Sequence, residues 1–292
     1  MRRNLILATS LLFVSASLYA HGRHGDFNIS FQGDDALAGC GDLSVRIEGE
    51  RVPVITENVP FHGSALAVRT DRNGGIRVTG SRGSGYAITV CKAVAPGIDP
   101  AAVRAVMAGN ELTAAGPEGQ RWVAYFLIEA PANASLDLHA SNGPIAISRF
   151  HGTVRAEAVN GPVSVKDSSG TITAGTTNGP VSITGGSGNI KLEATNGPVT
   201  VKLADTVWDG SLEASTRNGP VSLKLPRGFR SGVLVEALGH GPVSCKAAGC
   251  PDLRLRSWED QRDRPRRIEL GSGPQVVRLS TVNGPVSVKE ND

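Results

Sequence analysis

Aromatic residues make up only 4% of this 292-residue sequence, so its core must be built from Val, Ile, Leu and Ala, and aromatic binding surfaces are scarce. The sequence also lacks an excess of positive or negative charge. Its net charge is only +3, which predicts no general attraction to polyanions. The sequence has no Gly-x-Ser-x-Gly elbow, no His-Glu-x-x-His motif and no phosphate-binding loop, so no enzyme class is indicated. With 40% hydrophobic and 20% charged residues, the composition is nevertheless that of a folded chain.

A secretory signal peptide is expected at residues 1–20. Arg2 and Arg3 precede an apolar run from Leu5 to Val14, and small residues follow the run. The run has about ten residues, far fewer than the roughly 20 that span a bilayer, so we expect no transmembrane segment. The mature protein is therefore predicted to be exported to the periplasm or the cell surface, with its net charge lowered from +3 to +1 by the loss of two arginines.

Four cysteines in an exported chain indicate two disulfides, for which three pairings are possible. We favour Cys40 with Cys91, which closes a loop of about 50 residues, and Cys245 with Cys250, which closes a short turn. No Cys-x-x-Cys pair occurs, so neither a zinc site nor a redox motif is expected. We predict no cofactor and no bound metal.

The tripeptide Asn-Gly-Pro recurs through the second half of the chain. Its spacings are 18, 18, 18, 22, 22 and 43 residues when the variant His240-Gly241-Pro242 is included, and the last gap holds either two repeats or one long excursion. The first residues of these turns are Asn142, Asn160, Asn178, Asn196, Asn218, His240 and Asn283.

Each repeat contains two predicted strands. Apolar residues alternate after every Pro, as in Val163 and Val165. In five repeats a glycine stands eight residues before the next turn, and a second alternating segment follows it, as in Ile172, Ala174 and Thr176. Each repeat therefore has two strands and two turns.

Two architectures fit this pattern: an antiparallel meander of hairpins, or a solenoid in which each repeat is one coil stacked on the last. A type I′ Asn-Gly hairpin needs an N–H on the residue after Gly, which Pro lacks. In a solenoid the same Pro can begin a strand, while Asn or Gly supplies a left-handed corner. We therefore predict an all-β fold, a single-stranded β-solenoid (β-helix) with two strands per coil of 18–22 residues, over residues 135–290.

The repeats resemble a known family. The segment Ala134–Ile147, followed by repeated Asn-Gly-Pro-Val-Ser-Val, is similar to the DUF4097 family of bacterial putative adhesins, whose function is unknown. The likeness extends upstream to Asn73–Val78, where Gly replaces Pro, and covers roughly residues 60–290. This chain departs from the family in having Pro after Asn-Gly, where many members carry Ser, Asp or Asn. The resemblance implies a β-solenoid with an adhesin-like role.

Residues 21–134 are expected to contain the first coil and a cap for the N-terminal end of the solenoid. One short helix is predicted near residues 99–108, with Asp99 as its N-cap and Gly109 at its end. The charged tail at residues 289–292 is expected to guard the opposite edge. Strands are also predicted at residues 27–32, 43–48 and 122–128.

Two columns of polar side chains are predicted on the outside of the coils. Stacked turn residues would hydrogen-bond to one another and to the turn backbone, which makes that column structural. Lysine recurs six residues past the turn, and stacked lysines repel one another unless acids or an anionic partner offset them. This stripe is a candidate site for polyanionic glycans or lipid head groups, with solubility and edge protection as the simpler alternative. Its members are Lys166, Lys202, Lys224, Lys246 and Lys289.

One coil breaks the repeat pattern at Glu236, His240 and Cys245. Such exceptions can mark a functional site, but a register slip after a one-residue bulge explains them more simply. The inward face would then consist of Val233, Val235 and Ala237.

The sequence thus predicts an exported, non-enzymatic module of the cell envelope, adhesin-like and either structural or interacting, whose partner is an unknown envelope protein or glycan. Nucleic acid is not expected, because no aromatic residues are interleaved with the basic ones. The alternative is a glycan-acting hydrolase or lyase with loop carboxylates at 205–209, where Asp205 and Asp209 stand, and at 259–263.

Overall fold

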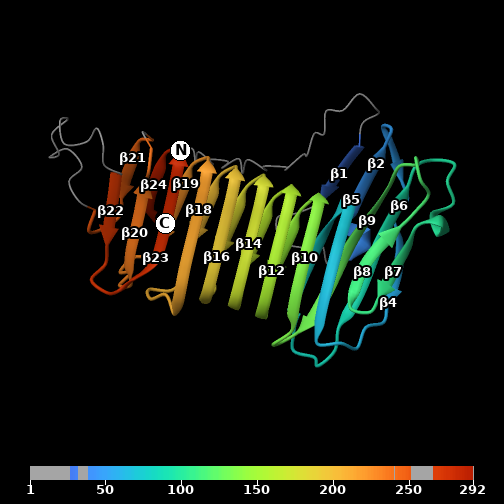
Figure 1. Ribbon diagram of the computed structural model, residues 1–292, viewed down its shortest axis with the longest axis horizontal. Coiled ribbons are helices and arrows are strands. Elements are labelled where there is room, and N and C mark those ends of the chain that lie inside the picture. The colour runs from blue at the N-terminus through green and yellow to red at the C-terminus, as the bar shows by residue number, and fades with distance from the viewer. Residues whose placement is uncertain (1–26, 32–38, 240, 251–265, 292) are drawn as a thin grey trace, which may run out of the picture.

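A computed structural model describes residues 27–31, 39–239, 241–250 and 266–291 (Figure 1). It is all-β, with a small antiparallel sheet and one large, nearly closed and mostly parallel sheet. The large sheet consists of two ladders, which we call the long-strand and the short-strand ladder, with one core between them. The predicted signal peptide at residues 1–20 and the acids at 259–263 lie outside the described residues.

The two ladders are described by their strands in spatial order. The long-strand ladder contains β7 (Arg104–Ala108), β8 (Glu111–Ala115), the first half of β5 (Ala65–Ser81), β10 (Ser135–Asn142), β12 (His151–Asn160), β14 (Ser169–Asn178), β16 (Gly188–Asn196), β18 (Gly210–Asn218), β23 (Gln275–Asn283), β20 (Gly232–Ala237) and β22 (Arg266–Leu270). The short-strand ladder contains β4 (Ile55–Val59), β6 (Ala87–Val94), β9 (Trp122–Pro131), the second half of β5, β11 (Ile145–Ser148), β13 (Val163–Lys166), β15 (Val181–Thr184), β17 (Val199–Lys202), β19 (Val221–Leu225), β24 (Val286–Glu290) and β21 (Val243–Lys246).

The chain alternates between the ladders, and each strand pairs in parallel with the equivalent strand of the next repeat. Leu136 of β10 lies beside Val154 of β12, which lies beside Ile172 of β14. Alternate residues point into the core and are buried, so aliphatic side chains form columns between the ladders. An antiparallel meander of hairpins does not fit these parallel registers.

The Asn-Gly-Pro corners explain why Pro is tolerated at the start of every short strand. Its carbonyl enters the ladder, as where the Val163 N–H donates to the Pro180 carbonyl at 2.9 Å. The glycine is required by close approach between coils, because a Cβ on Gly161 would lie 2.1 Å from the Gly143 carbonyl oxygen. We expected Gly or Asn to supply a left-handed corner, and this holds for only some corners. Gly143 and Gly179 have φ +157° and +154°, whereas Gly161 has no positive φ. The crowding, in contrast, is common to all of these corners, including Gly197 and Gly219.

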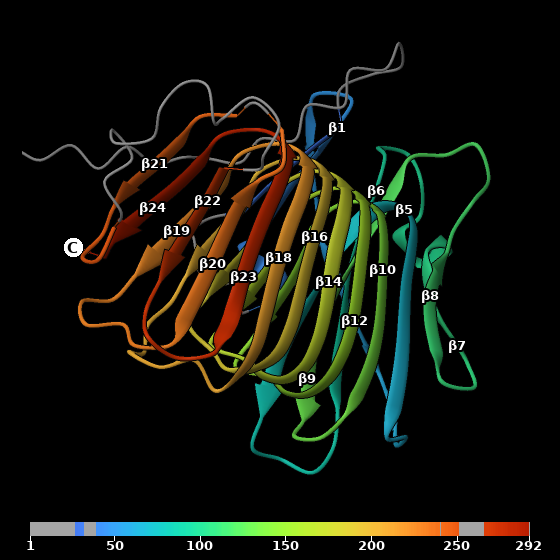
Figure 2. The ribbon, with the colours of Figure 1, turned by 60° about the vertical axis from the view of Figure 1, so that its left-hand side comes forward.

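The C-terminal repeat is out of chain order in the stack. Figure 2 shows β23 between β18 and β20, and β24 between β19 and β21. The 43-residue gap therefore contains an excursion that includes β22, which pairs antiparallel with the outer side of β20, before the chain returns to the interior of the sheet. Because β24 is an inner strand, the charged tail does not guard the edge as we expected, and β21 and β22 form the edges instead.

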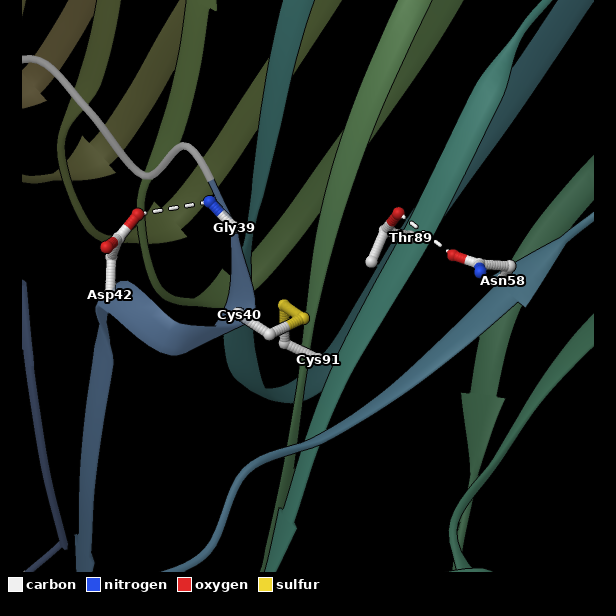
Figure 3. Close-up of a disulfide and its surroundings, with 6 residues drawn as sticks. All are labelled: Gly39, Cys40, Asp42, Asn58, Thr89 and Cys91. Atoms are coloured by element: carbon white, nitrogen blue, oxygen red, sulfur yellow. Dashed lines mark hydrogen bonds between the residues drawn. A yellow bond between two sulfur atoms is a disulfide. The ribbon is translucent and has the colours of Figure 1, made fainter.

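The N-terminal region extends both ladders and adds a second layer. The small sheet of β1 (Phe27–Phe31), β2 (Leu43–Ile47) and β3 (Glu50–Val52) packs its buried valines and isoleucine against β6 and β9. A disulfide joins Cys40, in the short 3-10 helix η1 (Cys40–Asp42), to Cys91 of β6 (Figure 3). The second disulfide joins Cys245 and Cys250, so both pairs are those that we favoured.

The helix predicted near residues 99–108 is wrong. Its start signal is real, since the Asp99 side chain accepts a hydrogen bond from the Ala101 N–H, but only a single 3-10 turn follows, η2 (Pro100–Ala102). The chain then forms β7, which pairs antiparallel with β8 across a two-residue turn that begins at Gly109, with φ +63°. The glycine that we took for a helix end is therefore a hairpin residue.

An ion pair attaches this hairpin to the short-strand ladder. Lys92 of β6 is buried and donates to the Glu57 carboxylate at 2.7 Å, and the same carboxylate oxygen accepts from the Ala105 N–H of β7. Partial burial alone would raise the pKa of Glu57, but the hydrogen bonds from Lys92 and Ala105 outweigh it and hold this pKa below its ordinary value.

Candidate functional site

The turn asparagines form a continuous hydrogen-bonded ladder along one corner of the stack. Each side-chain amide donates to the carbonyl of the asparagine on the preceding coil, at 2.9 to 3.0 Å. Asn283 donates to Asn218, which is 65 residues away in the chain, because the C-terminal coil stacks on that coil. The asparagine side chains therefore hydrogen-bond mainly to one another. His240, the variant turn residue, lies outside the described residues. Its members are Asn142, Asn160, Asn178, Asn196, Asn218 and Asn283.

The exceptional coil at residues 232–246 is a register slip. Val233, Val235 and Ala237 are buried, and a bulge at the start of β23 adjusts the register. Glu236 points outward toward Arg267 at 4.0 Å, and Cys245 is held in its disulfide. No reactive cluster is formed by the described residues of this coil.

Four of the five predicted stripe lysines lie on directly neighbouring strands, and the fifth does not. On the outer face of the short-strand ladder, Lys202, Lys224, Lys289 and Lys246 lie side by side on β17, β19, β24 and β21. We call these four residues the four-lysine run. Lys166 stands apart from it, because Thr184 of β15 lies between Lys166 and Lys202.

The four lysines are exposed and lie on strands about 4.8 Å apart. Within the described part of the chain, no carboxylate oxygen lies within 4 Å of any of these four ammonium groups. Glu290, which follows Lys289 directly, instead accepts from the Ala248 N–H. As far as the described residues show, the run is therefore a strip of positive charge without carboxylate partners, and the mutual repulsion of its lysines costs stability unless an anion binds.

A half-buried column of hydroxyl groups lies directly beside the lysines, two residues earlier on the same strands. Along β17, β19, β24 and β21, the outward positions hold only hydroxyl residues and lysine, with no apolar or aromatic side chain. Ammonium and hydroxyl groups both donate to anionic oxygen atoms. Over the four-lysine run the hydroxyl residues are Thr200, Ser222, Ser287 and Ser244.

The long-strand ladder carries a shallow groove of about 600 Å³ that we did not foresee. It follows the positions just before the asparagine ladder, where two consecutive residues of each coil face outward, as Thr177 and Asn178 do. This break in the alternation of inward and outward residues is the signal from which the groove could have been predicted. The groove includes Glu157 and Glu193, which lie two strands apart with Gly175 between them, a backbone separation of about 9.6 Å.

Both groove carboxylates are already paired with a cation of their own strand. Arg155 donates to Glu157, and Lys191 donates to Glu193 at 2.8 Å, a hydrogen bond that raises the pKa of Lys191. Glycosidases use two carboxyl groups that face the substrate as acid and base or nucleophile. Glu157 and Glu193 are instead each engaged by a cation two residues away on the same strand.

Of the loop carboxylates of the hydrolase alternative, only those at 205–209 lie among the described residues. Asp205 and Asp209 are both exposed, on the insertion between β17 and β18. That insertion is anchored by Trp208, whose indole N–H donates to the Gly188 carbonyl at 3.1 Å. Among the described residues there is no group of three or more His, Cys, Asp or Glu side chains that could hold a metal ion.

Comparisons with known proteins find no matching family model and no matching curated protein, so the DUF4097 resemblance stays a prediction. Solved structures with some likeness include a "putative cell adhesion protein" from Clostridium sporogenes, at 13% identity and a TM-score of 0.31, over 82% of this chain and 100% of that one. Two "putative adhesins" also match over 82% of this chain. The Bacteroides fragilis protein has 14% identity, 97% coverage and a TM-score of 0.28, and the Parabacteroides merdae protein has 12% identity, 96% coverage and a TM-score of 0.24.

Proposed function

We propose that this chain is an exported, non-enzymatic β-solenoid that acts as an adhesin-like interaction module of the cell envelope. Each strand pairs with its equivalent one repeat away, which supports stacked coils of 18–22 residues over residues 135–290, with residues 21–134 as the cap and first coil. The two disulfides support export, because disulfides persist in oxidising compartments. None of the described helices is long and apolar enough to cross a membrane.

The observation that carries the interaction role is the four-lysine run. A row of exposed ammonium groups with no carboxylate partner among the described residues is a costly arrangement for a chain whose overall charge is close to neutral. A polyanionic partner removes that cost and gains charge-assisted hydrogen bonds. The proposed partner is therefore a polyanion of the envelope, and the stack of coils is the rigid support that presents the lysines.

Binding to immobilised heparin, as a model polyanion, tests this function. We expect the mature protein to bind and the variant with Lys202, Lys224 and Lys246 changed to Glu to lose binding. A control variant with Arg46, Arg51 and Arg82 changed to Glu has the same net charge but leaves the lysine face intact, and should retain binding.

Equal loss in both variants, or no binding by the unchanged protein, would contradict the proposal. The hydrolase alternative is tested on the same preparation by incubating it with envelope polysaccharides and measuring new reducing ends. Cleavage that is lost when Asp205 and Asp209 are changed to Asn would refute the non-enzymatic assignment.

A further inference from the structure

The four-lysine run depends on the C-terminal coil. Lys289 belongs to the last strand of the chain, yet it lies between Lys224 and Lys246, because β24 is inserted between β19 and β21. Removal of this coil would leave a gap in the middle of the run. The site is thus built from β17, β19 and β21, which follow one another at one-repeat spacing, and from β24, whose Lys289 comes 43 residues after Lys246. It is continuous only in the fully stacked molecule.

Resting on the proposed function, we propose that the ligand is a linear anionic polysaccharide that lies along the stack axis, across the strands, over Lys202, Lys224, Lys289 and Lys246. The ammonium groups take its carboxylate or sulfate oxygens, and the adjacent hydroxyl column donates to the same chain. Strand spacing sets the lysine repeat at about 4.8 Å, comparable to the length of one sugar residue. Consecutive sugars can then meet consecutive coils.

The shape of the site favours a polymer over a membrane surface. The run is one lysine wide and three strand spacings long, roughly 14 Å. A lipid surface is bound by broad basic patches together with apolar side chains that enter the interface. The outward positions of these four strands contain neither, because only Ser, Thr and Lys occupy them.

Thr184 marks one end of the site and offers a gain-of-function test. A lysine at this position would join Lys166 to the run and give six adjacent lysines. Thr184→Lys should therefore extend the site for a ligand long enough to use it. Thr195→Lys adds the same charge on the long-strand ladder, where Thr195 is exposed, and serves as the matched control.

Two lysine losses give the complementary test. Lys289→Gln removes a central member of the run, whereas Lys166→Gln removes a lysine that Thr184 separates from it. Exposed ion pairs are worth up to about 1 kcal/mol, so we expect Lys289→Gln to weaken binding about fivefold and Lys166→Gln by less than about twofold. Because both residues are on the surface, circular dichroism and thermal unfolding should confirm that both variants fold.

The experiment is calorimetric titration of all five proteins with size-defined heparin oligosaccharides, from tetrasaccharide to dodecasaccharide, at several salt concentrations. Thr184→Lys should tighten binding of the long oligosaccharides but not of the tetrasaccharide, and Thr195→Lys should change neither. Lys289→Gln should lower the slope of log affinity against log salt by about one, as expected for one lost phosphate-like contact.

The outcomes separate this inference from the proposed function. If the unchanged protein binds no oligosaccharide, the proposed function itself fails. If it binds, but Lys166→Gln costs as much as Lys289→Gln and the two lysine additions act alike, binding follows net charge and the axial site is refuted. Tighter binding to anionic phospholipid vesicles than to the dodecasaccharide would also overturn it, in favour of a membrane surface.

Discussion

Replacement of a corner glycine by alanine tests the claim that close approach between coils, and not a special backbone angle, requires glycine. Gly197 is the most informative position because it lies in the middle of the stack. A Cβ at Gly197 would lie 1.9 Å from the carbonyl oxygen and 2.5 Å from the carbonyl carbon of Gly179. These are backbone atoms of the neighbouring coil, so no side-chain rotation can relieve the clash.

The magnitude follows from the hydrogen bonds at this corner. Carbon and oxygen atoms in contact between strands lie roughly 3.3 Å apart, so the corner must open by about 1.4 Å. That shift stretches three bonds to the preceding coil beyond hydrogen-bonding distance: Gly179 N–H to the Asn196 carbonyl, Val181 N–H to the Pro198 carbonyl, and the Asn196 amide to Asn178. At about 1 kcal/mol each, Gly197→Ala should cost about 3 kcal/mol.

Thermal unfolding followed by circular dichroism measures this cost, and we expect the Tm to fall by roughly 5–10 °C. Gly85→Ala is the matched control, because a Cβ at Gly85 meets no atom within 4 Å and this residue has no positive φ. The control should unfold at the same temperature as the unchanged protein. Equal Tm values for the two alanine variants would refute the close-approach argument.

Three further predictions concern other contacts. Asn178→Ala removes two ladder hydrogen bonds and Asn142→Ala removes one, so the first should lower the free energy of unfolding in urea by about 1 kcal/mol more than the second. Cys91→Ser removes a disulfide that joins residues 51 apart in sequence and contributes about 4 kcal/mol to stability in the chain-entropy model, whereas Cys250→Ser removes one that joins residues only five apart and should lower the Tm less. Glu57 has a lowered pKa, so its contribution to stability is present above the ordinary carboxyl pKa and is lost as the pH falls through the folded value; Glu57→Gln should lower the Tm at pH 7 and flatten its decline in acid.

Much of the stack could be predicted from the sequence because its determinants are local and repeated. Alternating valines define each short strand, and Pro after Asn-Gly excludes the hairpin, since the observed corner uses only the carbonyl of Pro180 and its equivalents. The inward set of Val233, Val235 and Ala237 was also foreseeable, because a buried Glu236 would have no partner. These inferences depend on single repeats and need no knowledge of distant contacts.

The segment after Asp99 was misjudged because its local signals are compatible with two structures. Asp99, Pro100 and Gly109 fit the start and end of a helix, but they also fit a 3-10 turn followed by a hairpin. Pairing of β7 with β8 and the bond from the Ala105 N–H to Glu57 favour the hairpin. Tertiary contacts thus override a modest helix propensity. Because this segment lies outside the repeats, the sequence contains no equivalent segment with which the two readings could be compared.

The order of the last two coils depends on which of them can be buried. Both β21 and β24 have the register to stack on β19, so their alternation does not distinguish them. Their inward residues do, because Val286 and Val288 of β24 are fully buried between two coils, whereas Val243 and Cys245 of β21 remain half-exposed at the edge. A cysteine that must reach Cys250 across a short turn suits an edge strand better than an inner one, which needs its whole inward face for packing. The interior position goes to the coil with two valines, and this choice places Lys289 in the middle of the four-lysine run.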